Sequence, residues 1–503
     1  MRKLALLAIL VFVPVLAALG CGKDEGASSA TSLAPAGSLA YGEVDLEPSG
    51  DQQEAIEALA AKFPGEGSAG ERLRSLIEEG LRDSDAPISF EKDVEPWLGD
   101  TAAFFVKGAQ GQAGAALIAT TDEDAARDAL EKAFDGKARE KSYEGVDYLA
   151  ANDAAGGVVD GFLVVGDPAG FKQAVDTSDG GSALDGDERY DEATADIADD
   201  RLGLFYMNLP ALLEAVQRQP GAEAFRSFGH LFEDPVVATF DADRDGVTFE
   251  ADAPASLAST MPFFGEGSDL VNELPADSWL ALAQPDLGKV LNYYVEAFGQ
   301  SVGGRDAVAG QFQALTGLDL DRDLLGWMGD FGVFVRGTNM ADLGGAVVIE
   351  TTDPGASARL IARLQQLAKA QPASGTTVEP LSARGGGKGF TLRDDELPAP
   401  VHMFQRDDRV VVAYGDAAAE DALAPTDRLG DSADFTDAAQ SIDGYAVSFY
   451  LAMGPVLELA DSAAAGDPEW LSARPYLEPL EALVGGTAGD NDELRSAFKI
   501  LVE

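Results

Sequence analysis

The sequence predicts an α+β protein made of two tandem homologous repeats, each a mostly antiparallel sheet with helices packed on one face. Three observations lead to this prediction: a motif that occurs twice, a shared order of the segments around it, and a recurring unit of two strands, an aspartate and a helix. The 503 residues also exceed what one ordinary hydrophobic core holds, so more than one domain is expected.

The repeated motif reads acid, base, Asp, and then Trp-[Leu/Met]-Gly-Asp. It occurs at residues 91–100 and again at 321–330, and each copy precedes an apolar run that is typical of a strand. Two of the chain's four tryptophans lie in it. Because the order of the matching segments on either side is also kept, we interpret the chain as a duplication.

We interpret this motif as a folding signature, with ligand binding by the aromatic pair as the alternative. A buried Trp would anchor the turn to the sheet. The Gly would supply the positive φ that ends the turn, and the last Asp would hydrogen-bond local backbone. Asp93 and Asp323 would cap the short helical turn. The signature residues are Trp97, Gly99, Asp100, Trp327, Gly329 and Asp330.

Hydrophobic periodicity gives the elements of the first copy in order. Alternation predicts strands, and apolar positions three and four residues apart predict amphipathic helices. The predicted strands are 38–46, 102–106, 115–120, 146–150, 161–165 and 201–208, with a closing hairpin at 236–251. The predicted helices are 51–63, 71–82, 122–134, one after Asp167, and 210–217.

An aspartate stands where a strand gives way to a helix at four places. A carboxylate there accepts hydrogen bonds from the first helical amides and complements the helix dipole. We therefore predict helix caps at Asp122, Asp167, Asp353 and Asp416. Short connections between successive strands predict antiparallel pairing.

The N-terminus predicts export and lipid attachment. Arg2 and Lys3 precede an apolar stretch that is short for a membrane span. It ends in Ala-Ala-Leu-Gly-Cys, which resembles a bacterial lipobox, and Cys21 is the only cysteine. We predict a diacylglycerol on Cys21 that anchors the protein to the outer face of the cytoplasmic membrane. A soluble secreted protein and an uncleaved anchor are the alternatives.

The predicted organisation follows from these segments. It comprises a signal peptide at 1–20 that is cleaved before Cys21, a flexible tether at 21–32, repeat domain 1 at 33–254, a linker at 255–273, and repeat domain 2 at 274–503.

Composition limits the function classes. The 87 acidic and 36 basic residues give a net charge of −51, which argues against nucleic-acid binding. It leaves a lipid or a cationic protein as partner, and the sequence does not indicate an oligomeric state. There are two histidines, His230 and His402, at positions that do not match between the copies. No recognised catalytic or cofactor motif is evident, so we expect no cofactor and favour a non-enzymatic protein.

One segment has the acid spacing of a calcium loop. Residues 241–252 carry candidate ligands at Asp241, Asp243, Asp245 and Asp252. However, the last position is Asp instead of Glu, Phe249 occupies a ligand position, and both flanks alternate like strands. A hairpin turn at Asp-Gly is therefore preferred over a metal site.

Taken together, the lipobox, residues 90–100 and the later strand–Gly-Asp–helix segments resemble a family of bacterial exported lipoproteins, the domain of unknown function 3352 family. The resemblance is firmer in the first copy, since Leu325-Gly326 stand where the first copy has Glu95-Pro96. It implies an exported protein and brings no activity, cofactor or catalytic residue.

Three functions remain open. The first is a non-enzymatic cell-envelope lipoprotein, a binding or scaffold module. The second is a carrier of a hydrophobic or lipid ligand, and the third is a carboxylate-based hydrolase. We place them in this order of preference because the sequence contains no recognised set of catalytic residues and has a clear lipobox-like segment.

Overall fold

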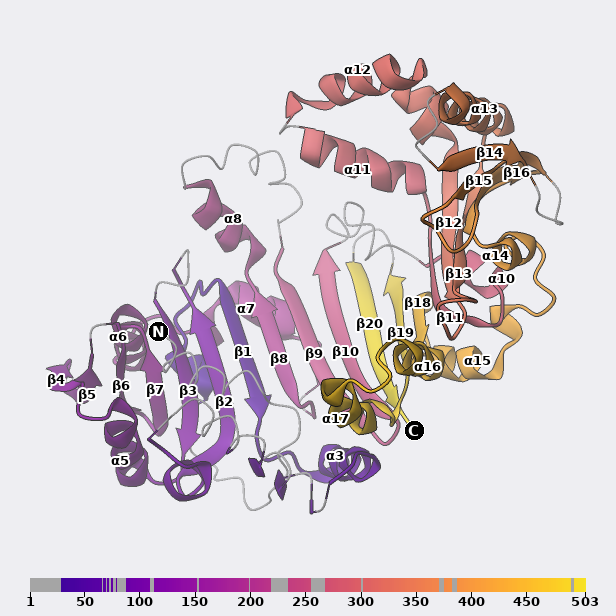
Figure 1. The fold of residues 1–503 in the computed structure, drawn as a ribbon. Helices are drawn as coiled ribbons and strands as arrows, with labels where there is room; N and C mark the ends of the chain where they lie inside the picture. Colours follow the sequence, from indigo (N-terminus) through magenta and orange to yellow (C-terminus); the bar gives the residue numbers. More distant parts are fainter. Residues whose placement is uncertain are drawn as a thin grey trace. The chain divides into compact units, whose positions relative to one another are not determined.

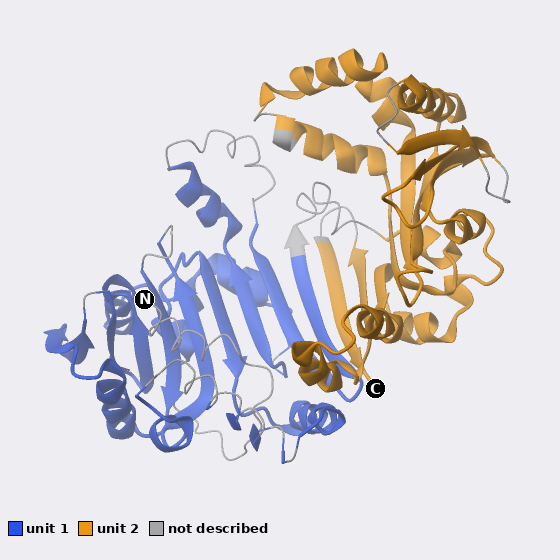
Figure 2. Ribbon diagram, viewed as in Figure 1, with its two compact units in different colours: residues 1–254 blue, residues 255–503 orange. Residues whose placement is uncertain are grey.

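The chain divides into two compact units, residues 1–254 (unit 1) and 255–503 (unit 2), in a computed structural model (Figure 2). The structure describes residues 29–503 except 66, 69, 72–73, 76–77, 79–86, 109–112, 152, 199, 219–233, 255–266, 300–301, 371–374, 382–386 and 490–492. The predicted signal peptide, Cys21, His230 and most of the predicted tether, linker and helix at 71–82 lie outside the described residues.

Unit 1 is an antiparallel sheet with helices, so the α+β class is confirmed (Figure 1). The sheet order is β4-β5-β6-β7-β3-β2-β1-β8-β9-β10. Its strands are β1 (Ala40–Asp45), β2 (Leu98–Val106), β3 (Gly114–Thr120), β4 (Arg139–Tyr143), β5 (Val146–Ala150), β6 (Ala155–Val159), β7 (Phe162–Gly166), β8 (Gly203–Met207), β9 (Val236–Asp243) and β10 (Gly246–Pro254). Its helices are α2 (Ala30–Leu33), α3 (Gly50–Lys62), α5 (Glu123–Phe134), α6 (Pro168–Ser178), α7 (Glu188–Thr194) and α8 (Leu209–Gln217).

Unit 2 has an antiparallel sheet of the same order, β14-β15-β16-β17-β13-β12-β11-β18-β19-β20. Its strands are β11 (Ser278–Gln284), β12 (Met328–Arg336), β13 (Gly344–Thr351), β14 (Thr376–Pro380), β15 (Lys388–Asp394), β16 (Val401–Arg406), β17 (Arg409–Tyr414), β18 (Ala446–Ala452), β19 (Leu480–Gly489) and β20 (Glu493–Val502). Its helices are α10 (Leu270–Glu273), α11 (Leu287–Gly299), α12 (Arg305–Thr316), α13 (Pro354–Ala370), α14 (Asp416–Asp421), α15 (Ala433–Gln440), α16 (Met453–Ala463) and α17 (Pro468–Leu477).

Helices cover both faces of each sheet, so the prediction of helices on one face is wrong. In unit 1, Leu117 of β3 packs in the same core as Phe171 of α6, whereas its neighbour Ile118 packs with Leu130 of α5. Successive residues of a strand point to opposite faces, so these are two separate cores. In unit 2, α14 and α15 share one core and α13 lies in the other. Central strands such as β7 are apolar throughout, and both of their faces therefore need cover.

The folded part extends beyond the predicted boundaries at two places. Leu33 of α2 is fully buried and Ala30 nearly so, and α2 packs in the core of unit 1, which shortens the predicted tether. Likewise Leu270 and Val271 of α10 are buried in the core of unit 2, although the linker was predicted to run to residue 273. Short apolar helices of this kind carry too little periodicity to be recognised in the sequence.

At one edge of each sheet lies a short strand that is mostly exposed. The edge strand of unit 1 is β4, which reads Arg-Glu-Lys-Ser-Tyr and has four exposed residues before a half-buried Tyr143. The edge strand of unit 2 is β14, which reads Thr-Thr-Val-Glu-Pro. Within the described parts of the chain, each of them pairs with a single neighbour, β5 and β15 respectively.

Candidate functional site

The two tryptophans of the repeated motif are buried and hold the same local structure. Each follows a short π-helical turn, Phe90–Val94 or Leu320–Leu324. The indole Nε1 of Trp97 donates a hydrogen bond to the carbonyl oxygen of Asp93 at 2.6 Å. Trp327 makes the corresponding bond to Asp323 at 3.0 Å. Because these donors are satisfied inside the turn, the indoles offer no free polar group to a ligand.

In unit 1, the Asp93 carboxylate closes the turn and ties it to the next helix. Its Oδ2 accepts from the backbone N–H of Ser89 at 2.7 Å, so it reaches back to the residue before the turn instead of capping the first helical amides. Lys132 of α5 donates to both of its oxygens. Burial alone would raise the pKa of Asp93, but the hydrogen bonds from Lys132 and Ser89 outweigh it and lower that pKa.

In unit 2, Asp323 has the same role with more partners. Its carboxylate accepts from the N–H of Asp319 at 3.0 Å, from Arg322 at 2.7 Å and from Arg359 of α13 at 3.2 Å. The Arg322 bond, the Asp319 bond and then the Arg359 bond hold the pKa of Asp323 well below its usual range, although the carboxylate is buried. Both motif carboxylates therefore fasten a turn to a helix.

The motif glycines are close-contact positions, and the prediction of a positive φ at Gly99 and Gly329 is wrong. Both lie inside strands, beside a register shift in the pairing of β2 with β3 and of β12 with β13. A Cβ on Gly99 would stand 2.9 Å from the carbonyl carbon of Ala119. A Cβ on Gly329 would stand 3.1 Å from the carbonyl oxygen of Glu350. Glycine is needed because the neighbouring strand approaches so closely.

The last aspartate of the motif differs between the copies, and neither side chain makes the predicted bond to adjacent backbone. Asp100 accepts from the Thr101 hydroxyl at 3.0 Å. Asp330 accepts from the Ser268 hydroxyl at 2.7 Å and, at 3.4 Å, from the distant backbone N–H of Asp286. These contacts are structural and bring together no set of reactive groups.

Three of the four predicted caps have capping geometry. Asp122 accepts from the N–H of Ala125. Asp167 accepts from two amides of α6 and also from the N–H of Gly114, which fixes β3 against this helix. Asp353 accepts from two amides of α13. Asp416 is the exception: it is the first residue of α14, Gly415 occupies the cap position, and no cap bond forms. The prediction for Asp416 is therefore wrong.

Asp416 instead contacts a buried histidine. Its Oδ1 lies 3.1 Å from Nε2 of His402, and Nδ1 of that ring lies 3.0 Å from the hydroxyl of Thr391. Thr391 and His402 are both fully buried. Burial lowers the pKa of His402, and Asp416 raises it by a smaller amount, so the net shift is downward. A nucleophilic hydroxyl must be reached by its substrate, so this Thr–His–Asp row is a core contact and not a hydrolytic triad.

The calcium-loop candidate is a hairpin. Asp241 and Asp243 lie on β9, Asp245 lies in the turn, and Asp252 lies on β10. Asp252 pairs with Val237, whereas Asp243 pairs with Gly246 next to the turn, so Asp252 stands at the far end of the hairpin. The four carboxylates are therefore not brought together as one ligand set. Burial, followed by repulsion from Glu250, raises the pKa of Asp241 to about 6.

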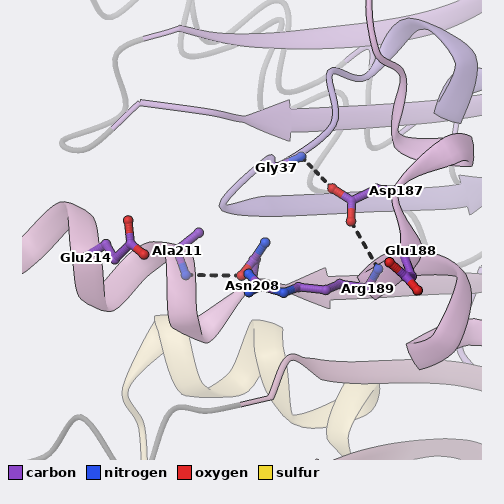
Figure 3. A pocket seen from close by; sticks show the side chains of 7 residues that line it. All are labelled: Gly37, Asp187, Glu188, Arg189, Asn208, Ala211 and Glu214. Atoms are coloured by element: carbon purple, nitrogen blue, oxygen red, sulfur yellow. Dashed lines mark hydrogen bonds between the residues drawn. The ribbon is translucent and has the colours of Figure 1, made fainter.

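A pocket in unit 1 is lined mostly by polar groups. It has a cavity volume of about 390 Å³ and lies where the loop before β1, the start of α7 and the start of α8 meet (Figure 3). The lining residues are Gly37, Asp187, Glu188, Arg189, Asn208, Ala211 and Glu214. No sequence motif marks these residues, and their only signal is the capping position of Asp187 and Asn208.

Backbone hydrogen bonds fix the frame of the pocket. Asp187 accepts from the N–H of Gly37 at 2.7 Å and from the N–H of Arg189 at 3.1 Å, as the dashed lines show (Figure 3). Asn208 accepts from the N–H of Ala211 at 3.1 Å and so caps α8. The Arg189 side chain extends toward Asn208 (Figure 3).

A cluster of tyrosines adjoins the pocket along the same elements. Tyr190 of α7 packs edge-on against Tyr41 and Tyr206, with ring centroids 5.9 and 5.1 Å apart. Burial and then the Asp187 carboxylate raise the pKa of Tyr206 to about 12. The Tyr206 hydroxyl is buried and has no hydrogen-bond partner among the described residues. A buried hydroxyl without a hydrogen-bond partner lowers the stability of the fold.

No helix within the described residues is long and apolar enough to cross a membrane. Nor, in that part of the chain, do three His, Cys, Asp or Glu side chains converge as a metal site would require.

The fold and the pocket thus define an α+β protein with two sheet units and a polar pocket in the first. The chain belongs to the family described as "Protein of unknown function (DUF3352)", whose profile matches residues 4–503. The predicted resemblance to the domain of unknown function 3352 family is therefore confirmed. No curated protein matched the chain.

Solved structures give only a weak likeness. Crystal form I of a protein designated TP0453 is 8% identical, with a TM-score of 0.25, over 46% of this chain and 80% of that one. Its crystal form IV gives 9% identity and a TM-score of 0.24 over 45% and 80%. Similarity at this level carries no argument about fold or function.

Proposed function

We propose that the chain is a non-enzymatic binding module, exported and tethered by a diacylglycerol on Cys21 to the outer face of the cytoplasmic membrane. The observation that carries the proposal is the lipobox-like Ala-Ala-Leu-Gly-Cys sequence, which ends in the only cysteine of the protein. A lone exported thiol would be open to oxidation or intermolecular pairing, and lipidation removes it.

Binding is favoured over catalysis by the state of the reactive groups. His402, the histidine within the described residues, is sealed in a core with Thr391. The motif carboxylates Asp93 and Asp323 are engaged by the backbone and by cations. The pocket of unit 1 is lined mostly by charged and amide side chains, which suits a polar ligand better than a lipid.

We also propose that the two units arose by duplication of one ancestral unit. The identical sheet order and the matching Trp–Asp bonds support this proposal. Duplication allows one copy to keep a binding site while the other retains only the scaffold.

Mass spectrometry of the N-terminal peptide tests the anchor. From protein expressed in a bacterium that processes lipoproteins, we expect a peptide that begins at Cys21 and carries diacylglycerol. A matched form that begins at Gly22 behind a conventional cleavable signal should leave the membrane fraction without detergent. An unmodified Cys21, or a matched form that stays as tightly bound as the parent, would refute the anchor.

A further inference from the structure

We propose that the pocket of unit 1 binds a small zwitterion of the amino-acid type, with its carboxylate on Arg189 and Asn208 and its ammonium group on Glu188. The inference rests on the proposed function, because it names the ligand class of that binding module. The lining residues supply both a donor end and an acceptor end in one cavity of about 390 Å³, a size within the usual range for small-molecule sites.

Asn208 provides the fixed part of the donor end. The residue is buried, with only 2% of its surface exposed. The Oδ1 atom is used in capping α8 through the N–H of Ala211, which locks the orientation of the amide. Among the described residues Nδ2 makes no hydrogen bond, so two N–H donors remain for a ligand.

Arg189 provides the charge at the donor end. Within the described part of the chain its guanidinium takes part in no hydrogen bond or ion pair, although Asp187 and Glu188 are its neighbours in sequence. Asp187 does not pair with it; the two Asp187 oxygens accept from the backbone N–H groups of Gly37 and Arg189. A planar guanidinium with free N–H groups suits a carboxylate, which it binds through two parallel hydrogen bonds.

The acceptor end consists of carboxylates. Glu188 is exposed and makes no contact with a cation in the described residues, whereas Glu214 is paired with Arg218 at 3.0 Å. A ligand of net negative charge would be repelled by these groups and by the overall charge of −51. A purely cationic ligand would leave Arg189 and Asn208 unused. A zwitterion matches both ends without net charge.

The corresponding positions of unit 2 lack this chemistry. The position before α16 that matches Asn208 is Ala452, which makes no cap bond. The second residue of α15, matching Arg189 in α7, is Asp434. The buried tyrosine of β18, Tyr450, packs edge-on against Phe435 where unit 1 has Tyr190. The polar pocket is therefore a property of unit 1 and not a requirement of the shared fold.

Calorimetric titration of the full mature protein in detergent tests the proposal. The probes are L-alanine and L-alanyl-L-alanine as zwitterions, N-acetyl-L-alanine as the anion and L-alanine methyl ester as the cation. We expect a zwitterion to bind at least about tenfold more tightly than the anion and the cation, because each of those lacks one of the two charges. The free amino acid and the dipeptide distinguish two sources of the same chemistry.

Two variants and a control complete the test. Arg189→Gln should weaken zwitterion binding about tenfold or more. Asn208→Asp should do the same, because it keeps the oxygen that caps α8 but replaces the donor amide with a repelling carboxylate. Arg127→Gln removes an exposed arginine of α5 that pairs with Asp124, away from the pocket, and should leave binding unchanged.

Three results would overturn this ligand class: neither zwitterion binds, N-acetyl-L-alanine binds as tightly as the zwitterions, or both pocket variants bind like the parent. None of them would alter the mass of the Cys21 peptide, so failure here and failure of the lipid anchor are separate outcomes.

Discussion

Replacement of Asp323 by Asn should destabilise unit 2 by about 2 kcal/mol at neutral pH. Asparagine can still accept from the backbone of Asp319 but loses the charged bonds to Arg322 and Arg359. A hydrogen bond to a charged group contributes about 1.5–3 kcal/mol when it is sheltered. The two arginine side chains are 73% and 53% exposed, so water competes and about 1 kcal/mol per bond is realistic.

The effect should depend on pH in a defined direction. The pKa of Asp323 is lowered in the folded state, so its stabilisation is present above the unfolded pKa of about 3.9 and is lost as the pH falls below it. About 1 kcal/mol of the difference between parent and Asp323→Asn should therefore disappear by pH 3.

Urea unfolding followed by tryptophan fluorescence measures this difference, because Trp327 bonds to the backbone of Asp323. Asp306→Asn is the control: it removes an exposed carboxylate of α12 and should change stability by less than about 0.5 kcal/mol. A difference for Asp323→Asn that is no larger than the control, or that stays constant between pH 7 and pH 3, would show that the carboxylate does not hold the turn.

Two further predictions concern packing and protonation. Gly99→Ala should lower the free energy of unfolding by about 1–3 kcal/mol in the same assay, because its Cβ would meet the Ala119 backbone. Gly186→Ala is the control and should cost far less, because there is open space around Gly186. Equal losses for the two variants would contradict the close-contact role of Gly99. The pKa of His402 is lowered in the folded state, so its stabilising effect is complete above about pH 6.5 and declines as the pH falls below that value. His402→Gln should therefore reduce the change in the free energy of unfolding between pH 7 and pH 5. The same pH dependence in the variant and the parent would count against a buried neutral ring.

Much of the fold could be predicted, because most of its helices and strands have a regular spacing of apolar residues. The helix expected at 51–63 is α3, and the strands expected at 115–120 and 146–150 are β3 and β5. The strands β4 and β6 were missed: β4 is charged and exposed, and β6 contains two glycines, so neither alternates. Their presence completes the meander from β4 to β7.

The pocket of unit 1 could not be predicted from the sequence, for a physical reason. Gly37, Asp187 and Asn208 lie far apart in the chain. The pairing of β1 with β8 brings the segments of Gly37 and Asn208 together, and the bridge between Pro35 and Ala183 brings in the segment of Asp187.

The role of the motif glycines could not be predicted either. A glycine that is needed for a turn and a glycine that is needed for close contact look identical in a sequence. Only the distance from Gly99 to the neighbouring strand separates the two roles.

The exposed edge strands β4 and β14 affect how copies of the protein interact at high local concentration. Molecules fixed to one membrane surface meet far more often than the same number in solution, and an open strand edge invites pairing between copies. The β4 edge places Arg139, Glu140 and Lys141 in the open, and β14 ends in Pro380, which cannot donate to another strand. With the proposed membrane anchor, these two edges would limit strand pairing between neighbouring copies.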